Sequence, residues 1–136
     1  MPGMSVPNDS IADACITLVR RFCIVADAVD ADAFASLFTE DGVFERGDLR
    51  VEGRAALVKM VGARPAGLIT RHLLTTSLVT PTDADTATGT HYCLVFVGGG
   101  QHDATQPIVR EYRDSYRRTP GGWRIAHRAV LTPFEG

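Results

Sequence analysis

The sequence predicts a single α+β domain in which helices come first and a curved, mostly antiparallel sheet follows. An apolar stripe recurs at three- and four-residue spacing near the N-terminus, which is typical of an amphipathic helix. Four strand-like segments with short turn sequences between them fill the second half, which favours antiparallel neighbours. The length of 136 residues fits one domain, covering residues 1–136, with a core of its own.

The helical part begins after a cluster of N-capping residues at 8–10. The apolar stripe of the first helix comprises Ile11, Cys15, Leu18, Phe22, Val25 and Val29. Asp32 is expected to cap a second, shorter helix whose apolar residues share one face. A turn is expected at 39–42, a short strand at 43–45 and a third helix from 54 to about 61.

The four long strands are expected at 70–80, 86–97, 108–119 and 123–131. Strands that curl around a packed helix enclose a cone with one open end, and side chains on the concave face can line a pocket there. The two-residue period places His72 on one face with Leu74, Thr76 and Leu78. It places His91 on one face with Cys93, Val95 and Val97. A histidine on an apolar strand face needs a hydrogen-bond partner, so each is either a satisfied core residue or a catalytic one.

Composition and charge exclude several classes of protein. Hydrophobic residues make up 45% of the chain, which argues against long disorder, and no apolar run approaches the ~20 residues that cross a membrane. The net charge of −2, from 14 basic and 16 acidic residues, argues against a nucleic-acid partner. Three cysteines without CxxC spacing indicate reduced, buried side chains, and the N-terminus lacks a signal-peptide pattern. We therefore expect a cytoplasmic protein that binds neither membrane nor nucleic acid.

Several sequence motifs are absent. The chain contains no P-loop and no GxSxG elbow, so neither phosphate cradling nor α/β-hydrolase chemistry is supported. No HxH, HExxH or paired-cysteine spacing is present, so neither a metal nor another cofactor is expected. Arg128 is interpreted as a solvated strand residue or an interface residue.

Three aspartates near the end of the first helix are candidates for acid–base chemistry. Asp27 is interpreted as a solvated helix residue and Asp32 as an N-cap. Asp30 directly follows the apolar stripe, where a carboxylate can be partly buried and directed at the sheet. A carboxylate that orients an imidazole produces a general base near neutral pH, and the predicted pair is Asp30 with His72.

Several separated motifs, in this order, resemble the SnoaL-like group of the nuclear transport factor 2-like superfamily. They are Asp30–Ala33, Leu37–Gly42, Gly53–Arg54, Arg71–Leu73, Tyr112–Asp114 and Gly122–Arg128. The resemblance covers almost the whole chain and implies a cystatin-like cone, with N-terminal helices packed on a curved, mostly antiparallel sheet. The superfamily includes dehydratases, isomerases, cyclases, dehydrochlorinases and non-catalytic binders, so the fold alone does not select a reaction.

Within this group the sequence is similar to scytalone dehydratase. The resemblance implies that Asp30, His72 and His91 match the catalytic aspartate and the two strand histidines of that enzyme. The tyrosine that precedes the aspartate there is Val29 here. Which tyrosine replaces it, if any, stays open, and the alternatives are Tyr92, Tyr112 and Tyr116.

The expected function is a cofactor-independent, dehydratase-like lyase that acts on a small apolar cyclic substrate. His72 is the general base, oriented by Asp30, and His91 donates a hydrogen bond or proton to the developing oxygen. The substrate-binding residues are expected to be Phe22, Leu74, Tyr92, Val95, Phe96 and Tyr112. The alternatives are an isomerase of the ketosteroid-isomerase or polyketide-cyclase type, and a non-catalytic ligand-binding or assembly module. A homodimer or homotrimer is expected in either case.

Overall fold

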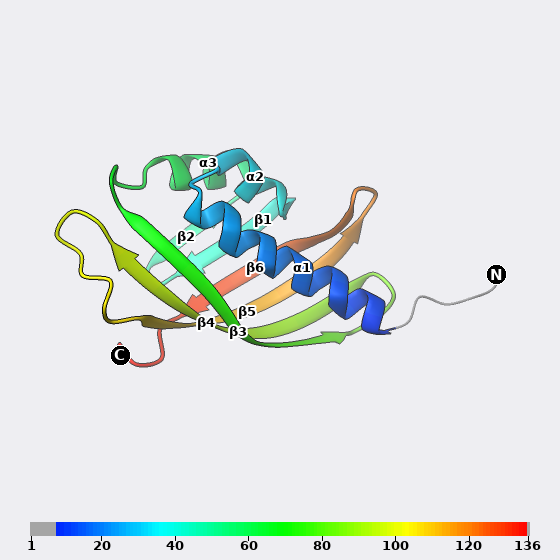
Figure 1. Cartoon of the computed structure of the whole chain (residues 1–136). Coiled ribbons are helices and arrows are strands. Elements are labelled where there is room, and N and C mark those ends of the chain that lie inside the picture. The colour runs from blue at the N-terminus through cyan, green and yellow to red at the C-terminus, as the bar shows by residue number, and fades with distance from the viewer. Residues whose placement is uncertain (1–7, 136) are drawn as a thin grey trace.

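The computed structural model describes residues 8–135 and consists of a helical layer on the concave face of a curved six-stranded sheet (Figure 1). The helices are α1 (Asn8–Asp27), α2 (Ala31–Ser36) and α3 (Arg54–Gly62). The strands are β1 (Phe38–Arg46), β2 (Leu49–Glu52), β3 (Ile69–Pro81), β4 (Thr86–Gly98), β5 (Ile108–Thr119) and β6 (Gly122–Leu131). The predicted α+β class is confirmed. No helix within the described residues is long and apolar enough to cross a membrane.

The sheet has the strand order β2-β1-β6-β5-β4-β3. Strands β3 to β6 form the predicted antiparallel meander, while β1 joins the sheet by parallel pairing with β6. The turn predicted at 39–42 is wrong, because β1 continues through these residues. Its register with β6 shifts between Phe38 and Val43, and the exposed pair Glu40-Asp41 lies in this irregular stretch. The irregular pairing explains why this stretch of strand carries polar residues that are typical of a turn.

Helix α1 packs mainly against β3 and β6. Its stripe is buried from Ile11 to Phe22, as predicted, but the stripe does not extend to Val29. That residue has left the helix, has a φ of 54° and is 40% exposed. Asp30, and not Asp32, caps α2: its carboxylate accepts the backbone N–H of Ala33 at 3.1 Å. The chain therefore leaves α1 earlier than the apolar periodicity indicates.

A bulge in β3 decides which residues reach the concave face. Leu74 pairs with Cys93 and Thr76 pairs with Tyr92, so Thr75 is the extra residue. Side chains beyond it change face, and Leu78 is 68% exposed. The prediction that Thr76 and Leu78 share the face of His72 is wrong for this reason. The predicted shared face of His91, Cys93, Val95 and Val97 on β4 is confirmed. The first three are buried while Tyr92 between them is exposed, and Val97 packs against the core.

Candidate active site

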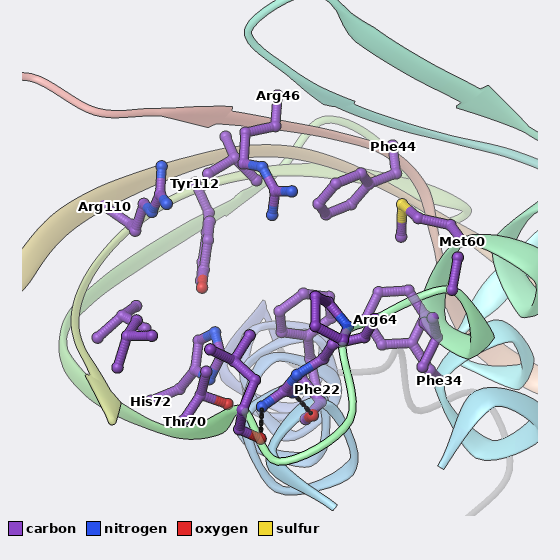
Figure 2. Close-up of a pocket in the computed structure, with 18 residues that line it drawn as sticks. Phe22, Phe34, Phe44, Arg46, Met60, Arg64, Thr70, His72, Arg110 and Tyr112 are labelled. Carbon is purple, nitrogen blue, oxygen red and sulfur yellow. Dashed lines mark hydrogen bonds between the residues drawn. The ribbon is translucent and has the colours of Figure 1, made fainter. Parts of the chain in front are cut away.

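A cavity of about 510 Å³ opens between the helices and the concave face of the sheet (Figure 2). Its wall is mostly apolar and includes Phe22, Phe34, Phe44, Met60, Val95 and Val97. Its polar lining residues are Arg46, Arg64, Thr70, His72, Arg110 and Tyr112. The volume is in the usual range for a small-molecule site.

His72 on β3 is held by Asp27, the last residue of α1. The Nδ1 atom of His72 lies 2.5 Å from Oδ1 of Asp27, and the two side chains are 15% and 12% exposed. The same carboxylate accepts the hydroxyl of Thr70 at 2.9 Å and the backbone N–H of His72 at 3.0 Å. Because an ionised carboxylate can only accept, Nδ1 carries the ring proton. The Nε2 atom is therefore the unprotonated nitrogen available to a ligand in the cavity.

Burial lowers the pKa of His72 below its ordinary value of 6.5. The hydrogen bond that His72 donates to Asp27 opposes this shift, and the positive charges of Arg64 and Arg128 add to it. The imidazole is therefore neutral at neutral pH, as a general base has to be.

Asp30 does not contact His72, so the predicted pairing of these two residues is wrong. Its carboxylate is exposed and serves as the cap of α2. The partner is Asp27, so its interpretation as a solvated helix residue is wrong. The sequence does contain a signal for it: Asp27 follows the buried Cys23 by four residues, and Cys23 follows the buried Val19 by four. Residues at this spacing share one helix face. The face of α1 that packs against the sheet therefore also places the Asp27 carboxylate against β3.

His91 lies away from the cavity, contrary to the expectation that it faces the same site as His72. Its side chain is fully buried. Its Nδ1 atom lies 2.8 Å from the hydroxyl of Ser77 and its Nε2 atom 2.6 Å from that of Tyr116. Burial lowers the pKa of His91 to about 4, so it is neutral at neutral pH. These contacts are those of a satisfied core histidine.

The hydrogen bonds of His91 continue into a buried ion pair. The Tyr116 hydroxyl donates to Asp114 at 2.6 Å, and Arg128 donates to both oxygens of Asp114 at 2.7 and 2.8 Å. Arg128 is fully buried, so its interpretation as a solvated or interface residue is wrong. The register pairs Asp114 directly with Arg128 on neighbouring strands, which places opposite charges side by side on the inner face.

Arg128 connects this network to the cavity wall. Its guanidinium lies 4.2 Å from the ring centroid of Phe22 and 4.1 Å from that of Tyr112, a cation–π arrangement with both rings. Within the described residues, its Nη1 atom has no hydrogen-bond partner. Both rings line the cavity, so the buried Arg128 holds two residues of the cavity wall in place.

Three of the six predicted substrate-binding residues line the cavity, namely Phe22, Val95 and Tyr112. Tyr92 is 46% exposed, and Phe96 next to Val95 follows the opposite alternation of β4. Leu74 packs against the core without reaching the cavity. The sequence contains no signal for the three cavity arginines, because long charged side chains on strands, as for Arg46 and Arg110, or in a loop, as for Arg64, are typical of solvated residues.

Tyr112 is the one of the three candidate tyrosines that lines the cavity. Its side chain extends from β5 with the hydroxyl toward His72 (Figure 2). Burial raises the pKa of Tyr112 well above its ordinary value, and the neighbouring Cys93 adds a smaller effect in the same direction. The hydroxyl therefore keeps its proton. A proton acceptor and a neutral hydrogen-bond donor thus face each other across an apolar space.

The described residues that line the cavity include no Asp or Glu. Among residues 10–135, no three His, Cys, Asp or Glu side chains gather as they would around a metal ion. The groups that can meet a ligand are one imidazole, one phenol, one threonine hydroxyl and three guanidiniums.

Comparison with known proteins agrees with this architecture. The family model described as a SnoaL-like domain matches residues 11–129. A Mycobacterium tuberculosis protein of unknown function is 32% identical, with a TM-score of 0.81, and the match covers 95% of this chain and 77% of that one. Comparison with curated proteins gives no match.

Two structures from Novosphingobium aromaticivorans extend the likeness. One is a nuclear transport factor 2-like protein with a cystatin-like fold, 27% identical, with a TM-score of 0.75 over 91% of this chain and 82% of that one. The other is provisionally named a scytalone dehydratase and is 17% identical, with a TM-score of 0.83 over 92% of this chain and 85% of that one. The predicted cystatin-like cone is confirmed.

Proposed function

The chain belongs to the SnoaL-like domain family, and from this premise we propose that it is a proton-transfer enzyme of the dehydratase or isomerase type. It acts on a small apolar cyclic carbonyl compound through an Asp27–His72 base and needs no cofactor. The observation that carries the proposal is the His72 ring, fixed by Asp27 through Nδ1 and bordering a cavity of about 510 Å³.

In the proposed mechanism Nε2 of His72 removes a proton from the carbon next to the substrate carbonyl. The electron pair of the C–H bond moves into an enolate, and the Tyr112 hydroxyl donates a hydrogen bond to the enolate oxygen. Asp27 stabilises the imidazolium that forms, since it is an anion already placed on Nδ1. The apolar wall excludes water, which strengthens both interactions.

The second half-reaction depends on the substrate. Where a hydroxyl group lies on the next carbon, the enolate expels it, the imidazolium returns its proton to it, and water and an alkene are the products. Where the ring instead carries a β,γ double bond, the enolate is conjugated with it, the imidazolium returns its proton to the γ carbon, and the product is the conjugated isomer. The dehydratase-type fold neighbour is compatible with the first course.

The test uses a panel of cyclic ketones and cyclic β-hydroxy ketones in D₂O, with proton NMR to follow exchange at the acidic carbon and loss of water. The variants are His72→Gln and Asp27→Asn, with Asp30→Asn as the matched control, because Asp30 is an exposed aspartate three residues away. We expect exchange in the wild type and in the control, and almost none in His72→Gln. Equal exchange in wild type and His72→Gln contradicts the proposal and favours a non-catalytic binding module.

We also propose a homodimer or homotrimer formed through the outer face of the sheet. Exposed apolar side chains gather there on β3 and β4, namely Ile69, Leu73, Leu78 and Tyr92. Such a patch on the surface of one chain is typical of an interaction site. Analytical ultracentrifugation of the wild type and of Leu78→Lys tests the assembly. We expect an oligomer for the wild type and a smaller species for the variant, and a monomer in both samples contradicts the proposal.

A further inference from the structure

We infer that the substrate is an organic anion: an apolar ring that carries a carboxylate, or a similar acidic group, held by Arg46 and Arg110. The inference rests on the proposed function, because that function places the reacting carbon of the substrate beside His72. The expected binding of an anion depends only on the charges of the cavity.

The sheet register brings the two arginines to one side of the cavity. Arg46 on β1 and Tyr112 on β5 both pair with Val130 on β6, which lies between them. Arg110 precedes Tyr112 by two residues and therefore shares its face of β5. Figure 2 shows the two guanidiniums on either side of Tyr112. Arg46 is still open to solvent on one side, and partial burial, followed by the charge of Arg110, lowers its pKa, as expected for neighbouring cations.

The cavity arginines have no carboxylate partner among the described residues. Four exposed arginines, Arg50, Arg113, Arg117 and Arg118, each form an ion pair with an Asp or Glu, while the exposed Arg20, Arg21 and Arg71 form none within the described part of the chain and are surrounded by solvent. Among residues 10–135, no carboxylate lies within ion-pair distance of Arg46, Arg64 or Arg110. Two guanidiniums on one side of a cavity repel each other, and an anion bound between them removes this repulsion.

The three cavity arginines differ in the donors they have left. Arg64 is used structurally, since it donates to the backbone carbonyls of Ala26 and Leu68 at 2.8 and 3.1 Å. Arg110 donates from one nitrogen to the hydroxyl of Thr132. Arg46 lies over the ring of Phe44, 5.9 Å from its centroid. A guanidinium has five N–H donors, so Arg46 and Arg110 retain enough to bind a carboxylate.

The rest of the cavity selects the body of that anion. The wall near His72 is aromatic and aliphatic, and no carboxylate among its described residues would repel an acid. A flat or alicyclic ring fits this surface, with its acidic group at the arginines and its reacting carbon near Nε2 of His72. Tyr112, between the two ends, can reach an oxygen on the ring.

Calorimetric binding of naphthoate and of the neutral, equally sized naphthamide tests the inference without any need for turnover. We expect the wild type to bind naphthoate about tenfold more tightly, as one charge-assisted contact allows. Arg46→Gln and Arg110→Gln should each reduce the preference and the double variant should abolish it. The matched control is Arg113→Gln, on the same strand as Arg110 but paired with Glu111 on the surface, and it should keep the preference.

Equal affinity for the two ligands in the wild type overturns the inference, as does a preference that survives the double substitution. Far-UV circular dichroism and thermal unfolding of each variant show whether it is folded, and Arg46→Lys with Arg110→Lys should retain part of the preference. The His72→Gln variant separates the two proposals. If it keeps the preference for naphthoate while the wild type exchanges no substrate proton, the anion site stands and the proposed reaction fails.

Discussion

The Nδ1 atom of His72 lies 2.5 Å from Oδ1 of Asp27, although the two residues are 45 positions apart in the chain. The contact joins the last residue of α1 to the inner face of β3. Asp27 also accepts two further hydrogen bonds from Thr70 and from the backbone of His72, so its carboxylate is fixed from three directions. The helix end therefore sets both the tautomer and the direction of the imidazole.

The first prediction concerns Asp27→Asn. The substitution keeps the size of the side chain but removes the charge that stabilises the imidazolium, so kcat should fall by a factor on the order of 10²–10⁴. Steady-state kinetics on a substrate identified by the exchange screen measure this. Asp30→Asn should leave kcat unchanged, because Asp30 caps α2 and is exposed. Equal losses in the two variants would show that the aspartates act only through stability.

The second prediction is the pH dependence of kcat/KM. His72 has to be unprotonated to accept a proton, and burial lowers its pKa below 6.5. The rate should therefore be constant at neutral pH and fall on the acidic side, with an inflection below 6.5. Because the bond to Asp27 opposes the shift, the residual activity of Asp27→Asn should have its inflection at still lower pH. An inflection above 6.5 in the wild type contradicts the assignment of His72 as the base.

The error at Asp30 shows where prediction from sequence reaches its limit. The α+β class, the helix-first order, the meander and His72 as a cavity residue followed from periodicity and residue type. The identity of its partner depended on where α1 ends. Apolar spacing continued to Val29, but the helix ends at Asp27 and the turn that follows needs a positive φ at Val29. Asp30 lies less than one helical turn beyond Asp27, and this small difference separates the exposed cap of α2 from the mostly buried partner of His72.

The predicted face of the residues after Leu74 on β3 is wrong for a related reason. Alternation predicts faces only while the register is unbroken, and Thr75 adds one residue to β3. Nothing in the run of Leu and Thr around it signals the bulge. The interpretation of Arg128 is wrong because its partner, Asp114, lies on a neighbouring strand. That pairing depends on the strand register, which the sequence does not fix.

The third prediction links His91 to acid stability. Its pKa is lowered from 6.5 to about 4 in the folded state by burial, so the unfolded chain binds more protons between these values. Its contribution is present above pH 6.5 and is lost as the pH falls toward 4, by about 3 kcal/mol. Urea unfolding at a series of pH values measures it. His91→Gln should show a smaller loss over this range, while His102→Gln, at an exposed position, should match the wild type.

The fourth prediction concerns the buried ion pair. Arg128→Met leaves the Asp114 carboxylate buried without its cation, so the free energy of unfolding should fall by about 3–5 kcal/mol. The double variant with Asp114→Asn should recover part of this loss, because the unpaired charge is gone. Arg113→Met, which breaks an exposed pair, should cost less than about 1 kcal/mol. Equal stabilities of Arg128→Met and Arg113→Met contradict a paired, buried Arg128.

The fifth prediction tests how tightly the network is packed at Gly89. A Cβ atom there would lie 2.9 Å from Nε2 of His91 and 3.0 Å from the hydroxyl of Tyr116, the two atoms that share a hydrogen bond. Both side chains are fully buried and cannot move aside without breaking that bond. Gly89→Ala should therefore lower the free energy of unfolding by about 1–3 kcal/mol. Gly62→Ala is the matched control, because no atom lies within 4 Å of its added Cβ at the end of α3, and urea unfolding should find it at least as stable as the wild type. An unchanged stability in Gly89→Ala would mean that His91 and Tyr116 can separate at no cost, which contradicts a tightly packed network at this position.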